Sequence, residues 1–261
     1  MFSVNAGKKA FILAIVCLLI LGCFSSVSAE GIFWDEPGFK LELEFWLSQT
    51  SGTLSNAAGG LDILGDLGLK GSNSLSGAAQ YTWGRNALRL SYWGLTNENT
   101  VNLKRTISLS GTSFLPGESV LGSLKSRMLE LSFERAVAGW ERGDLFCFVG
   151  ARGDDFDLHL AAFEGKASSL RLQPFLLEAG LRGRFFVAEN WCLQGRFSTS
   201  LANTGGVRGS HMELYAGTRY YFLPGWSVGA DYRYARISAA EGQNEMNFTY
   251  QGPLFSLNYQ Y

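Results

Sequence analysis

The sequence predicts an all-β fold: a transmembrane, antiparallel up-and-down β-barrel of about ten strands, with eight or twelve strands as alternatives. Three observations predict it. Apolar side chains recur at every second position in many segments, which places them on one face of a strand. The links between these segments are alternately short and long. No segment after residue 29 approaches the roughly 20 apolar residues of a spanning helix.

The first 29 residues have the features of an export signal. Two lysines precede an apolar run, and small residues ending at Ala29 suit cleavage. We therefore expect residues 1–29 to be a signal peptide, cleaved after export through the Sec pathway, and residues 30–261 to form the barrel domain. The alternatives are a retained anchor helix and a lipoprotein modified at Cys23.

The clearest alternation lies in the first segment, where Phe39, Leu41, Leu43, Phe45 and Leu47 share one face. The fifth segment is apolar on both faces, so its facing stays open, and the tenth is expected to shift register at Gly252-Pro253. The expected strands are 39–47, 73–83, 87–97, 125–137, 144–152, 170–187, 191–201, 211–222, 226–236 and 245–261.

Short and long connections follow one another along the chain, which is typical of tight periplasmic turns and longer external loops. In hydrocarbon every backbone N–H and C=O group needs a protein partner, so the sheet must close on itself. The short turns are 84–86, 138–143, 188–190 and 223–225, and the long links are 51–72, 98–124, 153–169, 202–210 and 237–244.

The charge is nearly balanced, with 22 Lys and Arg residues against 23 Asp and Glu residues, so no nucleic-acid partner is expected. Cys147 and Cys192 fall on strands separated by one other strand, about 10 Å apart, which predicts two free thiols. Aromatic residues near the strand ends predict interfacial girdles. They are Trp83, Tyr92, Trp93, Trp140, Trp191, Tyr220, Tyr221, Phe222 and Trp226.

The last strand alternates Phe255, Leu257, Tyr259 and Tyr261 with polar residues. It resembles the insertion signal of bacterial outer-membrane β-barrel proteins, with the aromatic positions matched and the usual glycine replaced by Ser256. The resemblance implies the outer membrane of a Gram-negative cell envelope. It also implies outer-membrane lipid and lipopolysaccharide as neighbours and the barrel-assembly machinery as a partner during insertion; the oligomeric state stays open.

The positions that alternate with the apolar ones carry a dense set of charges, which the barrel would turn toward its lumen. Near-balanced charge in a narrow lumen predicts a paired ionic network that plugs the barrel, because isolated charges would be costly there. A restrictive, porin-like pore is the alternative. The network residues are Glu42, Glu44, Arg89, Glu130, Glu134, Glu178, Arg182, Arg184, Arg196, Glu213, Arg219, Asp231 and Arg233, with Lys40 and Arg152.

Catalytic patterns are sparse, and no cofactor, zinc spacing or phosphate loop is expected. Asp157 and His159 lie two residues apart, so the carboxylate could orient the imidazole as a general base. The pair resembles the Asp-x-His pair of omptin surface proteases, which also need a second acidic pair; Asp62 and Asp66 lie in a Gly-rich loop. A hydrolase using His211, or a Ser/His lipid A-modifying site, is the other enzymatic alternative.

Loop 51–72 is unusually apolar for an external segment, and loop 98–124 contains Leu103, Ile107 and Leu109. The first is expected to fold inward as a lid, form a surface helix or bind a partner, and the second to add a hairpin or two further strands. We therefore expect a non-enzymatic integral barrel, either a structural anchor for surface loops or a narrow channel. An outer-membrane hydrolase and an adhesin or ligand-binding barrel that uses these two loops are the alternatives.

Overall fold

The computed structural model describes residues 37–56, 59–204 and 207–261. The expected signal peptide, the retained helix and the lipoprotein site at Cys23 lie outside the described residues. Every regular element in these ranges is a β-strand. The described part of the chain contains no helix with the length and apolar character to cross a membrane.

Ten long strands form the wall of the molecule, and four short strands lie at one end of it. The wall strands are β1 (Gly38–Asn56), β3 (Gly71–Trp83), β4 (Asn86–Asn102), β7 (Ser119–Trp140), β8 (Gly143–Ala162), β10 (Phe175–Ala188), β11 (Trp191–Thr204), β12 (Val207–Leu223), β13 (Trp226–Glu241) and β14 (Asn244–Gln260). The short strands are β2 (Gly59–Asp62), β5 (Ile107–Leu109), β6 (Thr112–Phe114) and β9 (Ala167–Leu172).

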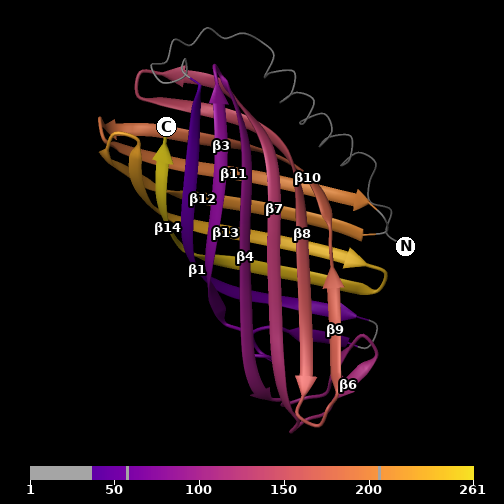
Figure 1. The fold of residues 1–261 in the computed structure, drawn as a ribbon. Coiled ribbons are helices and arrows are strands. Elements are labelled where there is room, and N and C mark those ends of the chain that lie inside the picture. Colours follow the sequence, from indigo (N-terminus) through magenta and orange to yellow (C-terminus); the bar gives the residue numbers. More distant parts are fainter. Residues whose placement is uncertain (1–36, 57–58, 205–206) are drawn as a thin grey trace.

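The wall closes into a ring of antiparallel pairs. Each wall strand pairs with the next along the chain, and β14 pairs back onto β1 from Lys40 opposite Gln260 to Ser55 opposite Glu245. Figure 1 shows the strands of one wall running steeply across the view and those of the opposite wall crossing behind them, as tilted barrel strands do. The predicted antiparallel barrel of about ten strands is confirmed.

We call the end of the barrel with the short turns its turn side and the end with the long loops its loop side. On the turn side, the outer face of the barrel is a belt of exposed apolar side chains. On β1, Phe39 and Leu43 are 44% and 52% exposed, whereas Glu42 between them is 9% exposed. Because successive side chains of a strand point to opposite faces, this contrast repeats around the ring. The belt covers about nine residues per strand, close to the 9–11 residues that a tilted strand needs to cross a bilayer.

Toward the loop side of the barrel, the inner and outer faces of the strands exchange their polar and apolar character. On β1, Trp46 and Leu54 point inward and are fully buried, while Ser51 and Thr53 point outward and are exposed. Apolar residues therefore face the lumen and polar residues face outward above the belt. Strands of up to 22 residues exceed the expected crossing length because their loop-side parts continue beyond the belt.

The segment expected as one strand at 170–187 is two strands, which corrects that prediction. Strand β9 folds back on β8 as a hairpin, and β10 then pairs with the lower part of β8. The break falls at Gln173-Pro174, where proline lacks the N–H that a ladder requires. The carbonyl of Pro174 instead accepts the N–H of Asp154 at 3.1 Å.

The register shift expected at Gly252-Pro253 is also wrong, since β13 and β14 pair in one register from end to end. Pairing with β1 lapses at Leu47 and Ser48, opposite these two residues. A side chain at Gly252 would place its Cβ 2.0 Å from the carbonyl oxygen of Leu47. Glycine therefore permits the two backbones to approach, and the Trp46 indole N–H donates to the Gly252 carbonyl at 3.3 Å.

Most of the predicted girdle residues lie on the outer face near the short turns, among them Trp140, Trp191 and Trp226. Two of them are exceptions. Trp93 is 2% exposed and points into the barrel, because it lies above the reversal on β4. Tyr221 continues the inward positions of β12 and stacks on Phe186 at 6.0 Å. Cys147 on β8 and Cys192 on β11 form no disulfide, and β10 lies between their strands, so the prediction of two unbridged cysteines is confirmed.

The belt predicts how the barrel tolerates charge on its outer face. Leu131→Arg places a cation in the middle of the belt and is expected to lower the free energy of unfolding by about 2–4 kcal/mol. Ser51→Arg, also outward but above the belt, is the matched control and should leave that free energy nearly unchanged. Denaturant unfolding of the barrel in lipid vesicles measures both, and equal effects would contradict the assigned belt.

Candidate functional site

The lumen of the turn-side part holds the charges that the sequence predicts there. All thirteen predicted network residues point inward, and all are buried except Glu44 and Arg184, which are half-buried. Two further acids, Asp144 and Asp154, join them with exposures of 3% and 4%. Sequence reasoning missed both acids, although they continue the period of two that runs through Arg152 on the same strand.

Glu42 is the first node of the network. Its carboxylate accepts hydrogen bonds from Arg89 at 2.8 Å and from Arg219 at 2.7 Å, and the Lys40 ammonium lies 3.7 Å away. These partners come from β4, β12 and β1, so one carboxylate links three strands across the lumen. Charge-assisted hydrogen bonds of this kind are stronger than neutral ones and compensate the burial of each ion.

A second node joins the other wall. The Arg196 guanidinium donates to Glu130 and lies 3.7 Å from Glu178, while Arg182 pairs with Glu134 at 2.6 Å. Arg184 makes a two-pronged contact with Asp144, with its closest distance at 2.9 Å. These pairs connect β7, β8, β10 and β11, so ions of both signs alternate around the lumen.

The third node lies at the upper edge of the network. Arg152 is fully buried and donates to Asp154 at 2.7 Å and to the His211 ring at 2.9 Å. Glu213 accepts from Arg233 at 3.0 Å and lies 3.7 Å from Arg152. His211 is therefore one member of a packed ionic cluster, 2% exposed.

Aromatic rings fill the space between these ions and settle the facing of β8, which its sequence left open. Phe146 and Phe148 point inward, and the guanidinium groups of Arg182 and Arg196 stack over them at 4.3 and 4.2 Å. Stacking of this kind satisfies a cation without another acid. The cavity found within the network has a volume of about 20 Å³, which is room for one water molecule.

Above the network, the lumen is occupied by an apolar plug. Trp46 and Trp93 meet edge to face at 5.8 Å, and Tyr250 packs against Trp93 at the same distance while bonding the Ser126 hydroxyl at 2.7 Å. The plug comprises Trp46, Leu54, Leu61, Ile63, Leu67, Leu69, Trp93, Leu95, Leu103, Ile107, Leu109, Phe114, Val120, Leu124, Met128, Phe156, Leu158, Leu160, Leu170, Leu172, Ile237, Met246, Phe248, Tyr250 and Leu254, with small alanines between them.

The first long loop closes the mouth as a lid, one of the three arrangements expected for it. Strand β2 pairs with the end of β1, and the chain that follows buries Leu61, Ile63, Leu67 and Leu69 in the plug. The side-chain amide of Asn99 on β4 donates to the Leu67 carbonyl at 2.9 Å. The apolar character of this loop therefore reflects a core inside the barrel mouth.

The second long loop adds the expected hairpin, β5–β6, and latches the lid from outside. Its Ile107 and Phe114 are buried in the plug. Arg105 donates to the carboxylate of Asp66 and, at 2.8 Å, to the carbonyl of Gly60. The hydrogen bond from Arg105 holds the pKa of Asp66 below its ordinary value of 3.8.

The structure places Asp157 and His159 on the outer wall of β8, above the belt. They share a face, but that face looks away from the lumen, from His211 and from the lid carboxylates. Ser123 is the register partner of His159 on β7, yet its hydroxyl donates to Glu98 at 3.0 Å. Asp157, His159 and Ser123 therefore do not form a hydrogen-bonded acid, imidazole and nucleophile.

The residues of the predicted insertion signal lie at the end of β14. Phe255 and Leu257 point outward and are 47% and 40% exposed. Tyr259 packs against Trp226 at 4.8 Å, and Tyr261, one residue past the strand, is 88% exposed. The terminal aromatic groups thus belong to the outer surface near the short turns.

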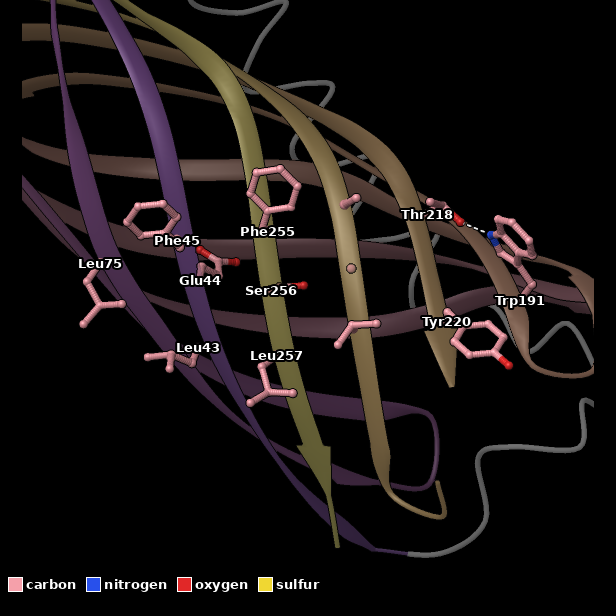
Figure 2. A pocket seen from close by; sticks show the side chains of 13 residues that line it. Leu43, Glu44, Phe45, Leu75, Trp191, Thr218, Tyr220, Phe255, Ser256 and Leu257 are labelled. Atoms are coloured by element: carbon pink, nitrogen blue, oxygen red, sulfur yellow. Dashed lines mark hydrogen bonds between the residues drawn. The ribbon is translucent and has the colours of Figure 1, made fainter. Parts of the chain in front are cut away.

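A shallow groove of about 550 Å³ crosses the belt. Figure 2 shows Leu43 and Phe45 on β1 beside Phe255 and Leu257 on β14, with the dashed hydrogen bond from Trp191 to Thr218 at the far end. The walls of this groove are apolar apart from Thr218 and from residues that turn toward the lumen. It is therefore a furrow in a hydrocarbon-facing surface and offers no polar cleft for chemistry. The described residues also contain no group of three or more His, Cys, Asp or Glu that could hold a metal ion.

The network predicts a large cost for breaking one ion pair. Arg196→Ala leaves Glu130 and Glu178 buried without their cation and is expected to lower the free energy of unfolding by about 3–5 kcal/mol. Arg236→Ala, which removes an exposed outward guanidinium on β13, is the control and should have little effect. Unfolding in lipid vesicles, followed by tryptophan fluorescence, tests both; a harmless Arg196→Ala would contradict the network.

The latch predicts a pH-dependent lid. The lowered pKa of Asp66 means that its contribution is complete at neutral pH and is lost as the pH falls below 3.8. The Leu69 amide donates to the Ile63 carbonyl at 3.2 Å, so its hydrogen exchange reports on the lid. As the pH falls through that range, its protection, measured relative to the intrinsic exchange rate at each pH, should decrease. In Arg105→Ala the amide should be less protected at neutral pH and lose this pH dependence. An unchanged pH profile in the variant would refute the latch.

No family model matches the chain, and no curated protein matches it in sequence. Solved structures do match in fold. The outer membrane protease OmpT of Escherichia coli is 10% identical, with 86% of this chain and 97% of that chain covered and a TM-score of 0.58. The translocator domain of the autotransporter NalP of Neisseria meningitidis is 14% identical, with 97% and 96% covered and a TM-score of 0.44. The attachment invasion locus protein Ail of Yersinia pestis is 9% identical, with 87% and 99% covered and a TM-score of 0.41. The chain thus has the fold of bacterial outer-membrane β-barrels, with a lumen filled by ion pairs below and by an apolar plug above.

Proposed function

We propose that this protein is a closed, non-enzymatic anchor of the bacterial outer membrane, which holds a rigid block of β-structure at the cell surface. The observation that carries the proposal is the filling of the lumen along its whole described height. Ion pairs and stacked aromatic rings occupy the level of the belt, and the plug with its lid occupies the level above.

The width of the barrel supports a closed lumen. Ten strands give an interior only slightly wider than that of eight-stranded barrels, which side chains fill, whereas wide aqueous channels belong to barrels of 16 strands or more. The cavity of about 20 Å³ beside Glu44, Arg89 and Arg233 has room for one water molecule. Of the two non-enzymatic alternatives, the structural anchor fits this interior better than the restrictive channel.

Placement in the outer membrane is part of the proposal. The belt of exposed apolar side chains, the aromatic residues beside the short turns and the aromatic end of β14 all support it. The fold shared with OmpT is consistent with that location. Export through the Sec pathway and insertion by the barrel-assembly machinery would follow from the same placement.

The protease activity named for OmpT is not extended to this chain. Asp157 and His159 point outward, and His211 is enclosed by Arg152 and Glu213. A peptide would have no described cleft in which to meet these groups together. We assign contact with other molecules to the loop-side end, because Phe163 is 78% and Leu115 is 51% exposed there.

Conductance in planar lipid bilayers tests the closed lumen. The folded protein is expected to give no stepwise currents, and a variant lacking residues 59–70 should also stay silent because the network lies below the lid. A general porin in the same bilayer serves as the positive control. Reproducible unitary currents from the intact chain would overturn the anchor and favour the narrow channel.

A further inference from the structure

The outer wall is hollowed at the loop-side end of β12, β13 and β14, around the hairpin that joins β13 to β14 (Figure 1). The depression has a volume of about 400 Å³, which lies within the range of about 300–1,000 Å³ of small-molecule sites. The side chains that line it are polar or small. They include Arg208, Ser210, Ser238, Ala240, Gln243 and Glu245.

Short side chains form the floor of this depression. In the register of the sheet, Ala240 on β13 lies between Arg208 on β12 and Glu245 on β14. Ser210 and Ser238 are opposite each other one row below, on the same outward face. The long side chains of Arg208 and Glu245 therefore stand at two opposite rims, with an uncharged floor between them.

The carboxylate rim is held in position by a chain of hydrogen bonds. The Ser238 hydroxyl donates to the side-chain carbonyl of Asn247 at 2.6 Å, and the Asn247 amide donates to Oε1 of Glu245 at 2.9 Å. The second carboxylate oxygen, Oε2, accepts no hydrogen bond from the described residues. Glu245 thus presents an oriented acceptor that a ligand can use.

The opposite rim carries a cation. The Arg208 guanidinium is exposed and forms no ion pair within the described part of the chain. Its strand and that of Glu245 are two strand spacings apart, which is about 10 Å. A ligand with one charge of each sign, separated by a comparable distance, would complement both rims at once.

We propose that this depression binds a short peptide of two or three residues with both of its ends charged. The peptide carboxylate pairs with Arg208, whose planar guanidinium can donate two parallel hydrogen bonds to it. The peptide ammonium donates to Oε2 of Glu245, and the Ser210 hydroxyl and the Gln243 amide are donors and acceptors for its peptide groups. Each residue spans at most about 3.3–3.6 Å, so two or three residues match the distance between the rims.

The height of the depression on the barrel favours a ligand from solution over a zwitterionic lipid headgroup. Tyr232, 52% exposed, belongs to the belt on the same strand as Ala240. Ala240 lies about 26 Å further along that strand, at about 3.3 Å per residue. The inference goes beyond the anchor role proposed above and does not depend on the filled lumen.

Isothermal titration of the folded chain in micelles of an uncharged detergent tests the proposal. The probes are triglycine, N-acetyltriglycine, which lacks the ammonium group, and triglycine amide, which lacks the carboxylate. An exposed ion pair strengthens binding by up to about fivefold, so the intact protein should bind triglycine about fivefold tighter than either blocked probe.

Two variants separate the rims. Arg208→Gln should bind triglycine and triglycine amide equally while still preferring triglycine to N-acetyltriglycine. Glu245→Gln should show the converse, with triglycine and N-acetyltriglycine bound equally. Arg236→Gln is the matched control, because Arg236 points outward on β13 below Ser238 and does not line the depression; this variant should bind as the intact protein does.

Two further measurements test the shape of the site. Ala240→Leu raises the floor and should weaken the binding of all three probes. Glycine carries both charges but is too short to reach both rims, so the intact protein should bind it more weakly than triglycine.

The proposal is overturned if triglycine fails to bind at about 10 mM, or if glycine or either blocked probe binds as tightly as triglycine. It is also overturned if Arg208→Gln and Glu245→Gln keep both preferences, or if Arg236→Gln loses them. Arg208 and Glu245 are exposed, so each variant should keep the heat-shifted gel band of the folded barrel. If one variant lacks that band, the other decides the outcome for its own rim.

Discussion

The structure depends on one constraint: in hydrocarbon, a backbone N–H or C=O group must find its partner within the protein. The pairing of β14 with β1 and of β8 with β10 meets this demand, because these two ladders turn a sheet into a ring. Closure in turn divides the side chains into two sets with different solvents. The lumen and the lipid-facing wall are therefore separate chemical environments built from alternate residues of the same strands.

The reversal of side-chain chemistry along the strands gives the barrel its two parts. At the belt, lipid accepts apolar groups, and the lumen must take the polar ones. Above it, the outer face meets water, so the inner face becomes an ordinary apolar core around Trp46, Trp93 and Tyr250. The lid and the β5–β6 hairpin complete that core from the open end. The barrel thus joins a part with an apolar outer face to a part with a polar outer face without a linker between them.

A filled lumen has energetic consequences. Buried ions are tolerated because most carboxylates of the lumen have guanidinium or ammonium partners, and Asp231 accepts from the Gln194 amide. Rings such as Phe146 also stack on the guanidinium groups. The arrangement leaves few charged groups of the lumen without a protein neighbour. Apolar side chains such as Phe163 and Leu115 are exposed at the loop-side tips.

Alternation, together with the alternating lengths of the links, predicted about ten wall strands, their antiparallel order, the belt and most of the inward charges, because a period of two is local and needs no knowledge of distant residues. It failed where a local backbone feature intervened, as at Pro174, which divides β9 from β10, and at Gly252, where close approach replaces a register shift. The sequence predicts Trp93 in a girdle, but the structure buries it in the plug, because aromatic content does not reveal the height of a residue on the barrel.

Only the tertiary structure decided which ions pair and which loops fold inward. Arg219 meets Glu42 from 177 residues away, and Arg105 reaches Asp66 across two loops. The Asp157 and His159 pair illustrates the same limit: their spacing placed them on one face, and only the closed ring determined that this face looks outward. Such contacts depend on curvature, tilt and closure, which arise when all ten strands assemble and which no single segment encodes.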